Sequence, residues 1–331
     1  MEAKPTFTDR LIEAIRQKRS LLCVGLDPQL RYIPPDMRAA AVARYRQAFE
    51  AIGRLYAQFN REVIDAVEPF VIAVKPQMAF YEAYGQWGLW AFAEIVQYAR
   101  SKGLIVIEDA KRGDGGDTAE AYADGHLGEV SVLGSNGVEL TKAESPIRVD
   151  AMTVQGWIGS ACVEPFVARV KQYGTGVFIV DKTSFRPNSE VEQIVTRDGL
   201  TNWQALAHLV SKWGKGTEGS YGYRNIGVVM GATYPTDAPT MRWILPNAWF
   251  LVPGYGGPQD GGADGAVVGV NSDGLGCVVN SSRGVIFAWH PVSKSRFQGP
   301  PENYRESAAQ AAEFARDELN AALQRSGKLN F

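Results

Sequence analysis

The sequence predicts an α/β fold, the (β/α)8 TIM barrel, in which eight parallel strands alternate with helices. Three observations support this fold. Eight short apolar runs recur along the chain, helical patterns lie between most of them, and the first run lacks the G-x-G-x-x-G loop of an open, doubly wound sheet. The length of 331 residues suits a barrel that forms a single domain over residues 1–331.

The predicted strands are rich in Val and Ile and nearly continuous in apolar residues. Such runs are typical of parallel strands covered on both faces, because neither face meets water. They are "LLCVGL" (21–26), "FVIAVK" (70–75), "LIVIED" (104–109), "DAMTV" (150–154), "GVFIVD" (176–181), "IGVVMG" (226–231), "AWFLV" (248–252) and "GCVVNS" (276–281).

The predicted helices begin near the N-terminus. There Leu11, Ile12 and Ile15 form one apolar stripe, and we expect Thr8 or Asp9 to be the N-cap. Further helical patterns cover residues 37–67, 86–103, 202–214 and 303–327. The first of these patterns predicts one long helix, and the last predicts an amphipathic helix packed on the barrel or on a partner.

Two segments exceed ordinary connections between strands and helices. They are residues 125–149 and 212–224, and we expect both to be surface insertions in the barrel domain.

Composition narrows the class of protein. The formal net charge of −2 gives no general attraction to nucleic acid or to an anionic membrane, and no apolar run reaches the roughly 20 residues of a spanning helix. The first residues lack a signal-peptide core, so we expect a cytoplasmic location. Cys23, Cys162 and Cys277 are scattered, and we expect buried, reduced thiols.

Charged side chains follow the third predicted strand, in "EDAKRGD". Asp109 and Lys111 are two residues apart, so a strand would direct both to one face, and Asp114 follows in the loop. Asp27 and Lys75 end the first two strands. Because the carboxyl ends of barrel strands meet at one face, these side chains predict an active site of alternating carboxylates and ammoniums.

Two other interpretations of this cluster stay open. The side chains could form structural salt bridges at the barrel rim. The carboxylates could instead bind Mg²⁺, although a lysine between them would repel a divalent cation. We predict no metal.

The last two strand ends predict a phosphate site. The segment "PGYGGPQDGGADG" is rich in glycine, so its backbone N–H groups can approach an anion closely. "NSSRG" then adds Arg283, whose guanidinium matches phosphate oxygens. Barrels often bind phosphate at these two loops, and Pro253 and Ser282 are further candidate binding residues there.

These motifs resemble the orotidine 5'-monophosphate decarboxylase family in its longer bacterial form. The resemblance runs through most of the chain. It rests on "LLCVGLDP", "FVIAVKPQMAFYEAYG", "DAKRGD", "DAMTVQGWIGSACVEPF", "VDKTS", "LVPGYG" and "VVNSSRG". It implies decarboxylation of orotidine 5'-monophosphate to UMP in pyrimidine synthesis, without a cofactor.

The resemblance also implies residue roles in the reaction. Lys111 would protonate C6 of the pyrimidine, and Asp109 would lie against the departing carboxylate. Lys75 would bridge Asp109 and the ribose, and Asp27 would bind the ribose.

Further implied roles concern the phosphate and a second subunit. Gln259 and Arg283 would hold the phosphate. Asp114 and Thr118 would reach into the neighbouring subunit's site, which implies a homodimer. Thr153 and Gln155, after the fourth strand, are candidates for contacts with the base.

The chain departs from the family pattern at one position, which keeps alternative functions open. The resemblance leads us to expect a hydrophobic residue after Asp114, but the chain has Gly115. A non-catalytic, nucleotide-binding barrel is therefore one alternative. A metal-dependent sugar-phosphate decarboxylase of the same superfamily is another, and Lys75 argues against it because that enzyme needs a carboxylate there.

Overall fold

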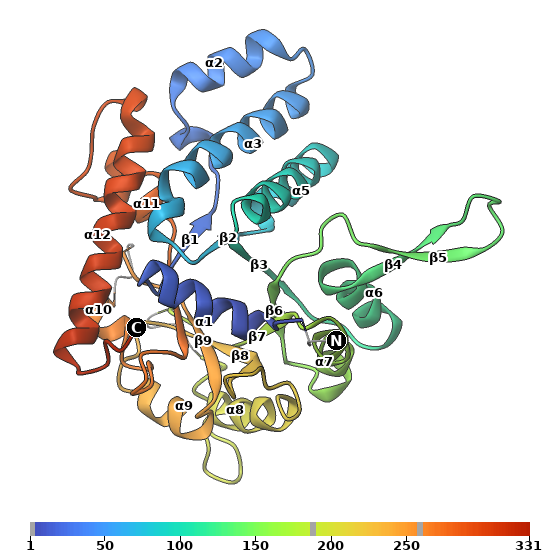
Figure 1. Ribbon diagram of the computed structural model, residues 1–331, viewed down its shortest axis with the longest axis vertical. Coiled ribbons are helices and arrows are strands. Elements are labelled where there is room, and N and C mark those ends of the chain that lie inside the picture. The colour runs from blue at the N-terminus through green and yellow to red at the C-terminus, as the bar shows by residue number, and fades with distance from the viewer. Residues whose placement is uncertain (1–3, 186–189, 257–260) are drawn as a thin grey trace.

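The predicted barrel is confirmed by a computed structural model that describes residues 4–185, 190–256 and 261–331. Eight parallel strands close in the order β1-β10-β9-β8-β7-β6-β3-β2, and helices surround them (Figure 1). The strands are β1 (Leu22–Leu26), β2 (Ala73–Pro76), β3 (Ile105–Arg112), β6 (Ala151–Gln155), β7 (Gly176–Lys182), β8 (Arg224–Met230), β9 (Ala248–Val252) and β10 (Cys277–Ser281). Each overlaps one of the eight apolar runs.

The strands are almost wholly buried, which explains their composition. Strands β1, β9 and β10 are buried at every position, because side chains point alternately into the barrel and toward the surrounding helices. The three cysteines are buried and unpaired, as expected.

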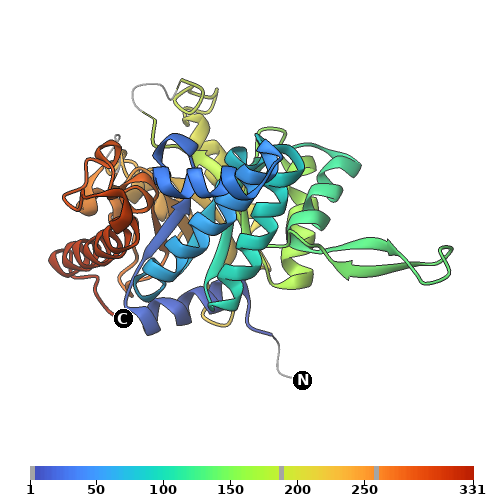
Figure 2. The same ribbon diagram turned by 90° about the horizontal axis from the view of Figure 1, so that it is seen from above.

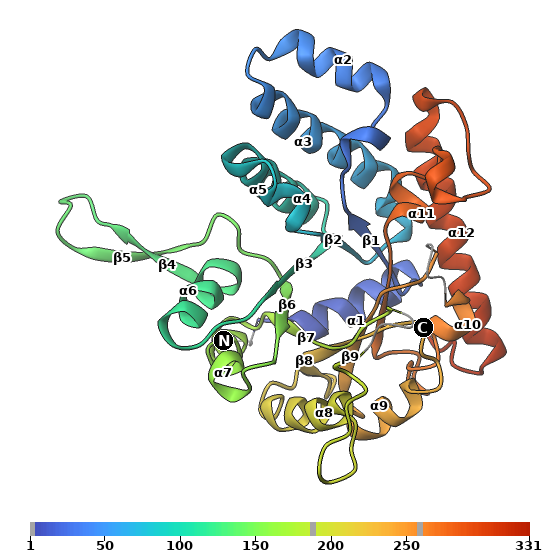
Figure 3. The same ribbon diagram turned by 180° about the vertical axis from the view of Figure 1, so that it is seen from behind.

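Helices cover the barrel on all sides (Figures 1 and 3). They are α1 (Phe7–Lys18), α2 (Pro35–Arg44), α3 (Ala48–Val67), α4 (Ala79–Glu82), α5 (Gly85–Ser101), α6 (Gly116–Leu127), α7 (Ser160–Tyr173), α8 (Asn202–Trp213), α9 (Ala238–Ile244), α10 (Gly262–Ala266), α11 (Arg283–Ile286) and α12 (Tyr304–Arg325). Short 3-10 turns are η1 (Leu30–Tyr32), η2 (Glu68–Phe70), η3 (Pro291–Ser293) and η4 (Pro301–Asn303). Within the described ranges, no helix is long and apolar enough to cross a membrane.

Helix α1 lies at the amino-terminal end of the barrel strands. The ring of Phe7 packs edge-on against Phe178 of β7, and the backbone N–H of Thr8 donates to Asn225 of β8. The predicted N-cap of this helix was wrong. Thr6 caps it in a capping box with Asp9, so Thr8 and Asp9 lie inside the first turn.

The single long helix predicted over residues 37–67 is also wrong, because the chain breaks between α2 and α3. Tyr45 is extended, and the Gln47 side chain accepts a hydrogen bond from the backbone N–H of Glu50. That side chain replaces the carbonyl that a continuous helix would have supplied.

The two expected insertions differ in position. Within 125–149, strands β4 (Glu129–Leu133) and β5 (Leu140–Glu144) form an antiparallel hairpin that projects from the barrel (Figure 2). Within 212–224, α8 continues to Trp213, and the following loop contacts α1, where Tyr221 N–H donates to Asp9. The second segment therefore lies at the end of the barrel opposite the strand-end charges.

Candidate active site

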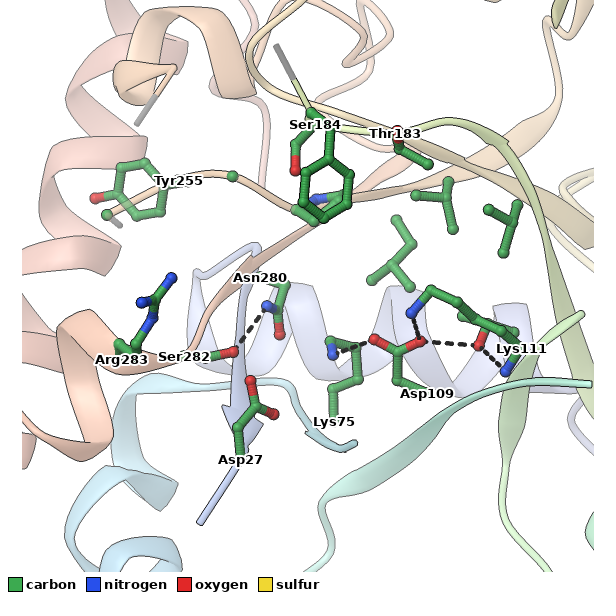
Figure 4. Close-up of a pocket in the computed structure, with 18 residues that line it drawn as sticks. Asp27, Lys75, Asp109, Lys111, Thr183, Ser184, Tyr255, Asn280, Ser282 and Arg283 are labelled. Atoms are coloured by element: carbon green, nitrogen blue, oxygen red, sulfur yellow. Dashed lines mark hydrogen bonds and ion pairs between the residues drawn. The ribbon is translucent and has the colours of Figure 1, made fainter. Parts of the chain in front are cut away.

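The predicted strand-end charges meet in one pocket at the carboxyl ends of the strands (Figure 4). Asp27 follows β1, Lys75 lies in β2, Asp109 lies in β3 and Thr153 lies in β6. The cavity has a volume of about 250 Å³. It is lined by Asp27, Lys75, Asp109, Lys111, Thr153, Val180, Thr183, Ser184, Phe185, Val229, Leu251, Pro253, Gly254, Tyr255, Gly256, Asn280, Ser282 and Arg283.

Asp109 is held by two lysines. Its Oδ2 atom lies 2.7 Å from Nζ of Lys75, and its Oδ1 atom lies 2.5 Å from Nζ of Lys111. Thr153 completes the contacts: its hydroxyl donates to Asp109 Oδ1 over 3.0 Å and accepts from the backbone N–H of Lys111 over 2.9 Å. One carboxylate thus fixes the positions of two ammonium groups.

These contacts shift the pKa values of Asp109 and Lys75. Burial alone would raise the pKa of Asp109, but the charges of Lys75 and Lys111 outweigh it and hold that pKa well below its usual range. Burial would lower the pKa of Lys75, and the carboxylates of Asp109 and Asp27 raise it above its ordinary value instead. Asp109 and Lys75 are therefore both charged at neutral pH.

Lys111 is placed by an unusual backbone rather than by regular strand alternation. Its φ is 50°, a left-handed value uncommon for a residue with a Cβ, and the β3–β6 register shifts between Glu108 and Arg112. Its side chain is 39% exposed, against 5% for that of Lys75. Lys111 is therefore the accessible cation and Lys75 the buried one.

Asp27 presents an unused acceptor. Its buried Oδ1 atom has no hydrogen-bond partner among the residues described. Burial raises the pKa of Asp27, although Lys75 and the Ser282 hydroxyl act in the opposite direction. A buried oxygen without a partner is costly, so this atom suits a hydroxyl donor on a ligand.

The expected phosphate loops form the other end of the pocket. Arg283 lies there with Ser282, at the end opposite Lys111 (Figure 4), and Pro253 also lines the pocket. The Arg283 side chain is exposed and makes no hydrogen bond or ion pair within the described part of the chain. Gly254 has a φ of 89° and admits no side chain easily, because a Cβ there would lie 2.8 Å from Cβ of Ser184. Gln259 lies outside the described residues.

Three other predicted residues lie outside this pocket. Gln155 lines a neighbouring cavity between β6 and α8, which shares Val180 and Thr183 with the first. Asp114 and Thr118 are exposed near the start of α6.

Several pocket residues were not predicted individually. They are Val180, Thr183, Ser184, Phe185, Val229, Leu251, Gly254, Tyr255, Gly256 and Asn280. The strand ends "VDKTS" and "NSSRG" contain Thr183, Ser184 and Asn280, so position at a strand end was the available signal. Tyr255 had no such signal beyond the glycine-rich loop around it.

Metal-binding side chains do not cluster in the described ranges, where no group of three or more His, Cys, Asp and Glu side chains could hold an ion. The charged part of the pocket instead alternates carboxylates with ammoniums.

A closed barrel with paired lysines and carboxylates at the carboxyl ends of its strands is typical of a TIM-barrel enzyme. The chain belongs to the orotidine 5'-phosphate decarboxylase / HUMPS family, whose model matches residues 20–296.

Relatives support this membership. An orotidine 5'-phosphate decarboxylase of Rhodopirellula baltica is 38% identical over 86% of this chain and 89% of its own length. That of Caldicellulosiruptor saccharolyticus is 34% identical over 96% and 99%. Among solved structures, the OMP decarboxylase of Leishmania donovani matches with a TM-score of 0.68 and 26% identity, covering 96% of this chain and 98% of that one.

Proposed function

We propose that this chain decarboxylates orotidine 5'-monophosphate to UMP in pyrimidine synthesis, without a cofactor. The observation that carries the proposal is the shared carboxylate, Asp109, which holds Lys75 and Lys111 side by side in the pocket. Family membership and the names of the relatives also support this reaction.

The proposed reaction breaks the bond between C6 and the carboxylate carbon. Carbon dioxide leaves, and the electron pair stays on C6. Lys111 then transfers one Nζ proton to C6 and regains a proton from water. Asp109 lies against the departing carboxylate and holds the Lys111 ammonium in place.

The ammonium of Lys111 also stabilises the developing charge. Two unit charges 4 Å apart attract by about 4 kcal/mol at an effective dielectric constant near 20, which corresponds to roughly a thousandfold in rate. Binding energy from the ribose and phosphate supplies a further part of the acceleration.

The remaining residues bind the ribose, the phosphate and the base. Asp27 accepts from a ribose hydroxyl through its unpartnered Oδ1 atom. Arg283 and Gln259 bind the phosphate, Pro253 and Ser282 are further binding residues, and Thr153 or Gln155 contacts the base.

A homodimer would complete the site. Asp114 and Thr118 are exposed and outside their own chain's pocket, so they are available to a second subunit. We place this homodimer in the cytoplasm.

The test is the ultraviolet absorbance change of orotidine 5'-monophosphate with the purified protein, with and without EDTA. Rapid loss of substrate that EDTA does not affect supports the proposal. Turnover of sugar phosphates that requires Mg²⁺, or UMP binding without turnover, would replace it with the corresponding alternative.

A further inference from the structure

The end of strand β7 builds one wall of the catalytic pocket. Thr183, Ser184 and Phe185 follow this strand and line the pocket, and Thr183 and Ser184 lie across the cavity from Asp109 (Figure 4). None of the three belongs to the group of Lys75, Asp109 and Lys111. The contacts within that group therefore do not hold this wall in place.

Glu192 holds the wall from one side. Its Oε1 atom accepts from the backbone N–H of Thr183 over 3.0 Å and from the Thr183 hydroxyl over 2.6 Å. Its Oε2 atom lies 2.9 Å from Nζ of Lys182. The backbone of Glu192 is anchored as well, because its carbonyl accepts from Trp203 N–H at the start of α8. One carboxylate thus ties the end of β7 to a helix.

Lys182 pairs with Glu192 and is not a pocket residue. Its side chain is fully buried, it does not line the catalytic pocket, and its Nζ atom lies 3.7 Å from the centre of the Tyr234 ring. A buried ammonium is costly unless it is paired, and Glu192 together with the ring face compensates it. Lys182 is therefore a structural cation and not a second proton donor.

Neighbouring Asp181 does not compete for the ammonium. It is buried, and neither carboxyl oxygen has a hydrogen-bond partner within the described ranges. Burial, reinforced by the charge of Glu192, raises the pKa of Asp181 well above its usual range. This raised pKa favours the neutral form of Asp181, and Glu192 is the carboxylate in contact with Lys182.

The β8 side holds the same wall by separate contacts. The Thr233 hydroxyl donates to the carbonyl of Ser184 over 2.9 Å, and the Tyr234 hydroxyl donates to that of Phe185 over 2.6 Å. These contacts fix carbonyls, whereas Glu192 fixes the N–H and the side chain of Thr183. Losing Glu192 would release Thr183 while the wall stays attached to β8.

We infer that Lys182 and Glu192 form a positioning pair that sets the Thr183–Phe185 wall against the bound nucleotide. This inference rests on the proposed function. Neither residue touches the pair of Asp109 and Lys111, so the effect falls on binding and not on proton transfer.

The test compares Glu192→Asp, Glu192→Gln, Lys182→Met and the double variant Lys182→Met/Glu192→Gln with the wild type. Glu192→Asp keeps the charge but is too short to reach both partners, so it remains informative if an unpaired buried charge unfolds the other single variants. The matched control is Lys18→Met/Glu68→Gln, which removes an ion pair of 2.7 Å on α1 and η2, away from the pocket.

Three readouts are used: UMP affinity by calorimetry, the KM and kcat for orotidine 5'-monophosphate, and amide hydrogen exchange of residues 183–185. Glu192→Asp should weaken UMP binding and raise KM about tenfold, as expected for the loss of a charged hydrogen bond. Its kcat and the pH profile of kcat should stay within about threefold of the wild type, and exchange at Thr183 should become faster. The double variant keeps an acceptor for Thr183 without leaving a charge unpaired, so its KM should return toward the wild-type value.

Unchanged UMP affinity in folded Glu192→Asp would overturn the inference, even if exchange at Thr183 increased. An equal loss of affinity in the control would also overturn it. A wild type that neither binds UMP nor turns over substrate would instead refute the proposed function on which the inference rests.

Discussion

Asp109 and Lys111 form an ion pair of 2.5 Å although the backbone of Lys111 is left-handed, with a φ of 50°. The strained conformation costs on the order of 1 kcal/mol, and it places the ammonium group over the pocket. The Thr153 hydroxyl holds both residues by contacting the Asp109 carboxylate and the Lys111 N–H. The backbone, the carboxylate and the hydroxyl thus position one accessible cation.

The first prediction concerns this cation. Lys111→Ala should lower kcat for orotidine 5'-monophosphate by at least about a thousandfold, because the stabilising charge and the proton are lost. UMP affinity, measured by calorimetry, should change only a few-fold. Arg112→Ala is the matched control, since Arg112 is the adjacent cation but pairs with Glu82 outside the pocket. Equal losses in both variants would contradict the role of Lys111.

The second prediction concerns the stability of the buried carboxylate. Asp109→Asn leaves Lys75 buried without its partner and should lower the free energy of unfolding by on the order of 3 kcal/mol at pH 7. Urea unfolding measures this difference. Asp65→Asn, at an exposed pair with Lys102, should have a much smaller effect.

The sign of the pH dependence follows from the lowered pKa of Asp109. A carboxyl group whose folded pKa lies below its unfolded value, about 3.9, stabilises the fold fully above that value. This contribution is lost as the pH falls through the folded pKa. The stability difference between wild type and Asp109→Asn should therefore be constant above about pH 5 and shrink below about pH 4. A difference independent of pH down to acid unfolding would refute the assignment.

The third prediction concerns Arg283. Arg283→Ala should weaken UMP binding by about 10- to 100-fold, because a charged hydrogen bond to phosphate is lost. Binding of uridine, which has no phosphate, should be unaffected. Arg296→Ala is a suitable control, since Arg296 stacks on Phe314 outside the catalytic pocket. Equal weakening of UMP and uridine would place the phosphate elsewhere.

The fourth prediction tests whether subunits share sites. Mixing Asp114→Ala subunits with Lys111→Ala subunits should restore activity, because a mixed dimer contains one site with both intact residues. Each variant alone should be nearly inactive. Activity is measured after subunit exchange, with heterodimers verified by mass. A verified heterodimer without activity would show that Asp114 does not act across an interface.

The fifth prediction concerns the departure at Gly115. Its backbone is extended, and a Cβ added there would meet no atom within 4 Å. Gly115→Ile should therefore fold and gain a few tenths of a kcal/mol in stability, because the unfolded chain loses freedom. If this position lines the neighbouring subunit's site, kcat/KM should rise several-fold. Unchanged kcat/KM would show that the hydrophobic residue is not needed in this chain.

The sequence alone determined the barrel and the composition of its charged face. Strands buried on both sides require continuous apolar runs, so all eight were recognisable from short segments. The parallel direction of the strands then brings their carboxyl ends together, which predicted the meeting of Asp27, Lys75 and Asp109. These features depend on local composition and chain direction, and both can be read from the sequence.

Only the tertiary structure decided how the site is held. The left-handed backbone of Lys111, the placement of Gln155 in a neighbouring cavity and the contact of Glu192 with Lys182 depend on register shifts and on packing between distant segments. The break between α2 and α3 likewise depends on a side chain replacing a backbone carbonyl. Such features reflect competition among long-range contacts, which residue spacing along the chain does not encode.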